Sequence, residues 1–179
     1  AMKDHYQNIY ESRAVMYARL VGAEDADGTL RAAVVAAASP ENSTLLDVGA
    51  GTGRVTRWLR AAGADVIAIE PAHAMRTQAA ASFRGVENRA PALVGGEAGA
   101  LPLADFSVDG AVEGWAYAHV RAWQPDAWRE ASAGMIRELE RVVRPGGPLV
   151  LIETAGTCVD EPTVPPSLQE LYELWAELG

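Results

Sequence analysis

The sequence predicts an α/β fold, a doubly wound, Rossmann-like parallel sheet of about five strands with helices on both faces. Short apolar segments alternate along the chain with segments whose apolar residues recur at helical spacing. Parallel strands that are covered on both faces have such continuous apolar runs. The predicted strands lie near residues 43–48, 65–70, 91–94, 108–113 and 148–153.

The length of 179 residues predicts one domain, residues 1–179, with three zones. Residues 1–40 are predicted to form helices, with a break in an acidic stretch near 22–28. Residues 43–153 form the predicted α/β core, and residues 154–179 a proline-rich loop followed by one helix.

Two sets of aromatic and apolar residues mark helix faces. Tyr6, Tyr10 and Tyr17 recur at roughly helical spacing, so they either face the core or belong to an N-terminal helical lid over a ligand. A helix before the fifth strand is predicted to bury one apolar face, formed by Trp128, Ala131, Met135, Leu139 and Val142.

A glycine-rich loop follows the first predicted strand. The strand continues through Asp47 into Gly49, Gly51 and Gly53, and an amphipathic helix comes next. Glycine lets the backbone approach a ligand closely, and a helix start offers free N–H groups and a positive dipole end. Dinucleotide-binding loops have the spacing Gly-x-Gly-x-x-Gly, whose third glycine would fall at Arg54. The loop therefore indicates a nucleotide-type site of another kind, or a plain tight connection.

The second predicted strand ends in a carboxylate, Glu70, 21 residues after Gly49. A carboxylate at this place can accept hydrogen bonds from two ribose hydroxyls with its two oxygens. Glu70 thus predicts adenosine binding without choosing between cofactors.

Motifs in the same order over residues 43–153 resemble those of the class I S-adenosylmethionine-dependent methyltransferases. Besides the glycine loop and Glu70, the motifs are residues 71–75, 94–103, 106–113 and 139–147. The resemblance implies S-adenosylmethionine as cofactor and S-adenosylhomocysteine as product. It assigns cofactor binding to Asp47, Gly49, Gly51, Glu70, Pro71, Met75, Glu97, Ala98 and Glu113, with Glu97 standing where aspartate is commoner. For Glu113 the alternative is a residue that only ends its strand.

By the same resemblance, residues 113–119 line the space between cofactor and acceptor. Trp115 and Tyr117 are predicted to wall a substrate pocket, although simple packing is the alternative. His119 resembles a position where many small-molecule methyltransferases carry histidine, and it could accept a proton near neutral pH. The alternative is a histidine bonded to nearby backbone.

The implied function is methyl transfer to an oxygen, nitrogen or carbon atom of a small-molecule acceptor. A protein or RNA methyltransferase is a rival within enzymes. A non-catalytic adenosyl-binding scaffold that holds a partner is the rival from another class. A nicotinamide-dependent enzyme is the least favoured hypothesis.

The amino-acid composition narrows the range of possible partners. The net charge of −9 argues against a nucleic-acid partner, because phosphate binding depends on Lys and Arg. The lone Cys158 excludes an internal disulfide, and without a Cys/His cluster no metal site is predicted. No apolar run approaches the roughly 20 residues that span a bilayer and no leader is visible, so we expect no membrane partner and a cytoplasmic location. Arg54 and Arg57 are expected to be solvated helix charges, with the steering of a carboxylate as the alternative, and His5 and His73 are expected to have no chemical role.

The C-terminal zone departs from the family. The methyltransferase sheet normally ends in an antiparallel hairpin, which is missing after residues 149–152. The fifth strand would then have a bare apolar edge. Two explanations stay open: the chain is a truncated form of a longer protein, or a partner covers the edge, for example a second copy in a homodimer.

Overall fold

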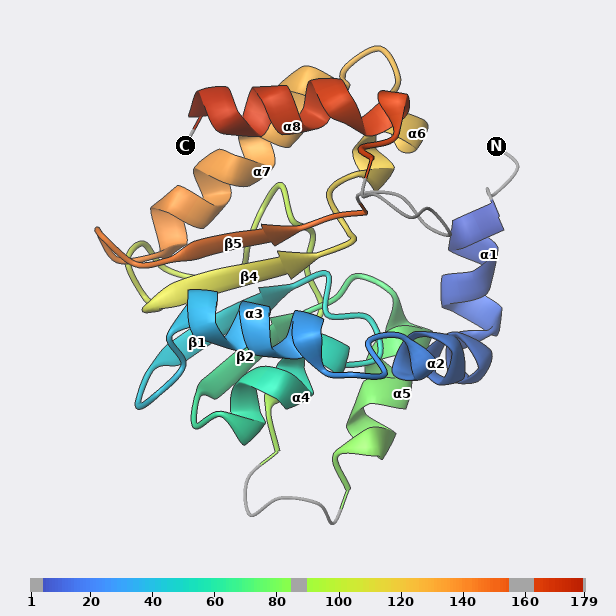
Figure 1. Cartoon of the computed structure of the whole chain (residues 1–179), viewed down its shortest axis with the longest axis vertical. Helices are drawn as coiled ribbons and strands as arrows, with labels where there is room; N and C mark the ends of the chain where they lie inside the picture. The colour runs from blue at the N-terminus through green and yellow to red at the C-terminus, as the bar shows by residue number, and fades with distance from the viewer. Residues whose placement is uncertain (1–4, 85–89, 155–162, 179) are drawn as a thin grey trace.

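The computed structural model describes residues 5–84, 90–154 and 163–178 (Figure 1). In this part of the chain, parallel strands form one sheet in the order β3-β2-β1-β4-β5, which confirms the predicted α/β fold. The predicted ranges differ from the observed strands by at most two residues at either end. The strands are β1 (Thr44–Val48), β2 (Asp65–Ile69), β3 (Ala92–Val94), β4 (Gly110–Gly114) and β5 (Leu149–Ile152).

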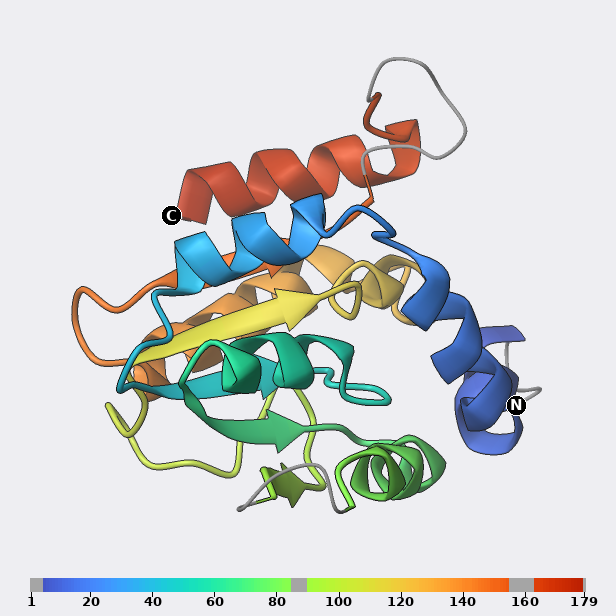
Figure 2. The same cartoon turned by 60° about the horizontal axis from the view of Figure 1, so that its bottom comes forward.

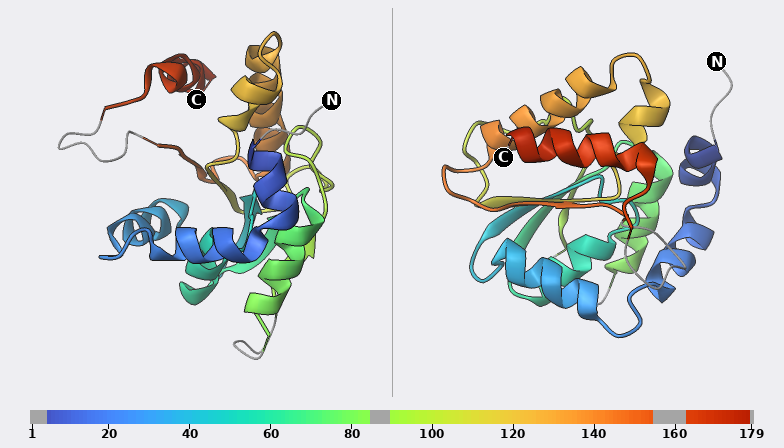
Figure 3. Two further views of the ribbon diagram at one scale, coloured as in Figure 1. Left: turned by 90° about the vertical axis from the view of Figure 1, so that its right-hand side faces the viewer. Right: turned by 45° about the horizontal axis from the view of Figure 1, so that its top comes forward.

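Helices cover both faces of the sheet, with α3 and α4 on one side and α7 on the other (Figure 3). Leu45 packs with residues of α3 and α4, whereas the next residue, Leu46, packs with residues of α7, because successive strand side chains point to opposite faces. Across the described ranges, no helix is both long and apolar enough to cross a membrane. The helices are α1 (His5–Ser12), α2 (Ala14–Ala23), α3 (Thr29–Ala38), α4 (Arg54–Ala61), α5 (His73–Ser82), α6 (His119–Trp123), α7 (Trp128–Val142) and α8 (Pro166–Leu178).

The strand order creates a switch point beside β1. From β1 the chain moves outward through β2 to β3, and then returns to place β4 on the other side of β1. In the register, Val48 lies opposite Ile69 of β2 and Glu113 of β4, so the loops after these three strands leave the sheet at the same edge. Figure 2 shows the strand arrows pointing toward α1 and α2. Ligands of open α/β sheets bind at this edge.

The buried face of α7 agrees with the predicted one at Leu139 and Val142 and differs from it over the first half of the helix. Ser132 and Ile136 are buried, whereas Trp128, Ala131 and Met135 are only half-buried. The cause is α8, which packs against α7: Leu171 is buried, and Trp175 Nε1 donates a hydrogen bond to the Ser132 hydroxyl over 3.1 Å. A serine was not expected on a buried face, because its partner lies 43 residues away.

The outer edge of β5 behaves as the sequence predicts. Among the described residues, β5 pairs with β4 alone, and Leu149 is 39% exposed. The α8 helix lies near β5 and α7 without adding a strand (Figure 1). The prediction of a truncated chain or a second copy at this edge stays a prediction.

Candidate donor and acceptor site

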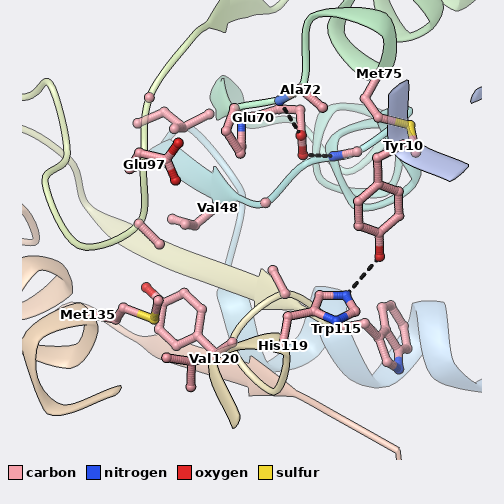
Figure 4. Close-up of a pocket in the computed structure, with 18 of the residues that line it drawn as sticks. Tyr10, Val48, Glu70, Ala72, Met75, Glu97, Trp115, His119, Val120 and Met135 are labelled. Atoms are coloured by element: carbon pink, nitrogen blue, oxygen red, sulfur yellow. Dashed lines mark hydrogen bonds between the residues drawn. The ribbon is translucent and has the colours of Figure 1, made fainter. Parts of the chain in front are cut away.

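A cavity of about 1040 Å³ opens at the edge where the strands end. Its walls come from the loops after β1, β2, β3 and β4, from α1 and α2, and from α5, α6 and α7. Figure 4 shows Glu70, Met75 and Glu97 toward one end, and His119, Val120 and Met135 toward the other. We call these the nucleoside end and the aromatic end of the cavity.

The glycines of the loop after β1 have different structural roles. Gly49 has φ +70°, and a Cβ added there would lie 2.3 Å from the Cβ of Ala116 in the loop after β4. Gly53 has φ +84°, and its Cβ would lie 2.9 Å from the Phe83 ring at the end of α5. The first glycine therefore lets two cavity loops meet, and the third lets α4 pack close to α5.

Glu70 joins the glycine loop to the start of α5. One carboxylate oxygen accepts a hydrogen bond from Gly51 N at 3.0 Å and the other from Ala72 N at 2.8 Å (Figure 4). Glu70 is 7% exposed, and burial raises the pKa of its carboxyl. Because each carboxylate oxygen has a second lone pair, both can still accept a bond from a ribose hydroxyl. The predicted ribose acid thus lies on the cavity with acceptor capacity to spare.

The residues predicted to hold adenine also line the nucleoside end. They are Pro71, Met75, Glu97 and Ala98. Met75 is buried and Glu97 is exposed. His73, expected to have no chemical role, lines the same end at the start of α5.

Asp47 and Glu113 lie beneath the cavity wall instead of on it. Asp47 Oδ2 accepts a 2.5 Å hydrogen bond from the Thr56 hydroxyl of α4, and burial raises the Asp47 pKa to about 6. Glu113 Oε1 accepts hydrogen bonds from Ala116 N at 2.6 Å and Tyr117 N at 2.9 Å. The two carboxyls therefore fix the loops that form the wall, and neither is among the described residues that line it.

The pKa of Glu113 is raised to about 8, first by burial and then by the nearby charge of Glu153. Glu153, just after β5, accepts a 3.0 Å hydrogen bond from Ala118 N. The second oxygen of Glu113 has no hydrogen-bond partner among the described residues. An acid buried in this way holds its proton near neutral pH.

The aromatic end brings together side chains of the N-terminal helices α1 and α2 and of helix α6. His119 Nε2 and the Tyr10 hydroxyl are hydrogen-bonded at 2.7 Å (Figure 4), and the His119 ring is stacked on Trp123 with centroids 4.8 Å apart. Tyr10 also meets Tyr17 edge to face, at 5.6 Å. Tyr10 and Tyr17 line the cavity, which favours the lid interpretation of the N-terminal helices over the core interpretation. The side chains of His5 and Tyr6, and Cys158, lie outside the described part.

The predicted pocket residues Trp115 and Tyr117 both line the cavity. Tyr117 is buried and meets Trp175 of α8 edge to face at 6.4 Å, so it also contributes to packing. Trp115 has φ +58°, a left-handed conformation that is rare for a bulky side chain. Such a conformation is held by its surroundings.

Arg54 holds Trp115, a role that sequence reasoning missed. Its guanidinium lies 4.1 Å from the centroid of the Trp115 ring, and it donates to the carbonyl of Val21 at 3.1 Å and to Glu24 at 2.5 Å. The expected solvated charge is wrong here, because the side chain is only 12% exposed. Arg57, expected to be solvated as well, donates to Thr52 O and the Ser82 hydroxyl. Except for Thr52, the partners are distant in sequence, so no local pattern predicts most of these contacts.

The fold and the site define an α/β protein with an open parallel sheet, at whose edge one cavity joins the nucleoside end to the aromatic end. A family model described as a methyltransferase domain matches residues 46–151. The chain belongs to the class I S-adenosylmethionine-dependent methyltransferase family. This confirms the resemblance, and the methyl donor of the family is the S-adenosylmethionine that the sequence predicted.

Individual relatives share part of the chain. It is 32% identical over 133 residues to a malonyl-[acyl-carrier protein] O-methyltransferase of Pseudescherichia vulneris, covering 74% of this chain and 44% of that protein. It is 40% identical over 111 residues to an uncharacterized methyltransferase of Mycolicibacterium vanbaalenii, covering 62% of this chain and 39% of that protein. The chain thus spans less than half the length of both curated relatives.

A solved structure shares the fold more completely. This protein of Methanococcus maripaludis, classed as an S-adenosyl-L-methionine-dependent methyltransferase, is similar with a TM-score of 0.68 and 17% identity. The similarity covers 99% of this chain and 74% of that one.

Proposed function

We propose that this chain catalyses methyl transfer from S-adenosylmethionine to a small-molecule acceptor. The observation that carries the proposal is one continuous cavity with a nucleoside end at Glu70 and an aromatic end at His119. Its volume of about 1040 Å³ lies at the top of the usual range for ligand pockets, roughly 300–1000 Å³. The space suits a donor and an acceptor side by side.

The donor fits the nucleoside end by shape and charge. Gly51 and Glu70 would hold the ribose, and Pro71 and Met75 would lie against adenine. Glu11, Glu70 and Glu97 line the cavity, and their side chains favour a ligand that carries positive charge. When bound, S-adenosylmethionine supplies an electrophilic methyl group on a positively charged sulfur, which keeps the electron pair of the broken S–C bond.

The chain's own contribution is mainly orientation. Holding an acceptor in line with the methyl group can supply about 7–11 kcal/mol of the barrier reduction. His119 would take the proton of an acceptor that arrives protonated, a contribution of roughly 10²- to 10⁴-fold. Asp47 and Glu113 would act from beneath, by fixing the loops on which Gly49 and Trp115 lie.

The proposal is tested by calorimetry with S-adenosylhomocysteine against NAD, followed by acceptor-dependent release of S-adenosylhomocysteine from S-adenosylmethionine. We expect binding of S-adenosylhomocysteine and none of NAD. Glu70→Ala should weaken that binding at least 10-fold, because a charged acceptor for two hydroxyls is lost, worth about 1.5–3 kcal/mol. Glu140→Ala, at an exposed position of α7, is the matched control. Undiminished affinity of the Glu70 variant would contradict the assigned role.

In the described part of the chain no strand pairs with the outer edge of β5, and this supports the scaffold alternative. It predicts that the chain binds S-adenosylhomocysteine weakly or not at all and assembles through residues 149–152. Light scattering across a concentration series distinguishes the two. A monomer that binds S-adenosylhomocysteine argues against the scaffold and against the homodimer.

A further inference from the structure

We propose that the acceptor is a phenol or a similarly acidic enol, and that Tyr10 occupies its place in this structure. The proposal rests on the proposed function and names the substrate class for the same site. Tyr10 is itself a phenol, and its hydroxyl is hydrogen-bonded to the ring nitrogen of the only predicted catalytic residue, His119, at 2.7 Å. The side chain therefore shows what this compartment accommodates.

The rings around Tyr10 make a compartment for a flat aromatic molecule. The Tyr10 ring meets the His119 ring edge to face at 5.7 Å and the Tyr17 ring in the same manner at 5.6 Å. Trp123, stacked on His119 with an angle of 16° between the rings, fixes the imidazole plane. Edge-to-face and stacked contacts at these distances are the favoured geometries of aromatic pairs. A second phenol ring can make the same contacts.

Apolar side chains form much of the remaining wall. Val120 and Met135 lie at the aromatic end (Figure 4), and Ala131 and the buried ring of Tyr117 also line the cavity. Ala131 and Met135 belong to the α7 face that was predicted to be buried; both are half-buried and line the cavity, and Met135 also packs against the core. Such a wall suits an uncharged aromatic ring and leaves His119 to recognise its hydroxyl.

The charges of the cavity select against an anionic acceptor. Among the described residues that line it, none is Lys or Arg, so a carboxylate such as the malonyl group in the name of the Pseudescherichia relative would find no fixed positive charge to pair with. A phenol enters neutral. Its proton passes to His119 Nε2, and the oxygen lone pair then forms the O–C bond to the methyl carbon, while the electrons of the S–C bond stay on sulfur.

The arrangement makes Tyr10 a competitor of the acceptor. Tyr10 lies on α1, a helix of 8 residues that packs against α2 and α5. An acceptor hydroxyl can reach His119 Nε2 only after the Tyr10 hydroxyl has left it. Removal of that hydroxyl should therefore strengthen phenol binding, whereas a residue that merely supports His119 would weaken it when truncated.

The test measures binding by quenching of tryptophan fluorescence, with the chain saturated with S-adenosylhomocysteine. The probes are 4-methylphenol, its methyl ether 4-methylanisole, and 4-methylbenzoate. We expect 4-methylphenol to bind at least 10-fold more tightly than either other probe. Tyr10→Phe should tighten 4-methylphenol binding by roughly 2- to 10-fold, the equivalent of one hydrogen bond. Tyr17→Phe, which removes a hydroxyl from the same cavity, should not tighten it.

Each contrary result has a distinct meaning. Preference for 4-methylbenzoate, equal binding of the ether, or weaker phenol binding by Tyr10→Phe would each overturn the inference while the donor site stands. Binding of no probe to a chain saturated with S-adenosylhomocysteine would overturn it too. Failure of S-adenosylhomocysteine to bind would instead refute the proposed function. The comparison of the three probes on the wild-type chain decides the matter even if Tyr10→Phe does not fold.

Discussion

Gly49→Ala is the substitution whose cost follows most directly from the structure. Alanine at φ +70° costs about 1–2 kcal/mol, because the left-handed conformation places Cβ near backbone oxygen. In addition, the new Cβ would lie 2.3 Å from the Cβ of Ala116, whereas carbon atoms in contact need about 3.5–4.0 Å. The two loops must therefore separate by roughly 1.2–1.7 Å. Overpacking of this kind costs about 1–3 kcal/mol.

We therefore expect Gly49→Ala to lower the free energy of unfolding by about 2–5 kcal/mol, measured by urea denaturation. Gly51→Ala is the matched control: Gly51 has φ +55°, but its Cβ would meet nothing closer than 3.9 Å. It should lose only the backbone cost of about 1–2 kcal/mol. Ala116→Gly should restore part of the stability of Gly49→Ala by removing the clash.

Equal losses in Gly49→Ala and Gly51→Ala, with no rescue by Ala116→Gly, would refute this reasoning. The loop contact between Gly49 and Ala116 would then contribute nothing beyond the backbone conformation. The same variants also test the geometry of the cavity, because Gly49, Gly51 and Ala116 all line it. Displacement of either loop by more than an ångström should weaken S-adenosylhomocysteine binding, and calorimetry measures that effect.

Two further predictions concern groups beneath and beside the cavity. The pKa of Glu113 is raised from 4.5 to about 8, so between these pH values the folded chain keeps a proton that the unfolded chain loses. The free energy of unfolding therefore falls as pH rises across this window, by up to about 1.4 kcal/mol per pH unit. Glu113→Gln, which keeps an oxygen for the same backbone N–H groups, should remove this part of the slope in urea unfolding at successive pH values; parallel curves would contradict it. Arg54→Ala should cost about 2–4 kcal/mol and speed limited proteolysis of α2, since the contacts to Trp115 and the end of α2 are lost. Arg54→Lys, without a planar group to stack, should recover little of it, and a wild-type cleavage rate would count against the clamp.

The core of the fold was predictable because its signals are local. Each strand is a short apolar run, and a glycine loop or an acid follows or ends it, so Gly49, Glu70 and Glu113 could be assigned to strand ends. Met75 and Glu97 were assigned from the family resemblance, and they line the cavity in segments that follow β2 and β3. A parallel sheet brings the ends of neighbouring strands to one edge, whatever their distance in sequence.

The buried face of α7 shows where that logic fails. Helical periodicity places an apolar stripe only to within about one residue, and neighbouring positions 131 and 132 compete for the core. Ser132 is the buried residue of the two, because α8 packs against it and Trp175 donates a hydrogen bond to its hydroxyl. Ala131 was thereby turned to the cavity.

By itself the sequence determined the strand positions, the glycine loop and the carboxylate that follows the second strand, since each depends on residue types within a few positions of one another. Tertiary structure decided which acids reach the cavity: Glu70 lines it, while Asp47 bonds to Thr56 inside. It also decided that Tyr10 meets His119, 109 residues away, and that Arg54 stacks on Trp115. These contacts join side chains of different elements that are far apart in the sequence, and no periodicity in the chain predicts them.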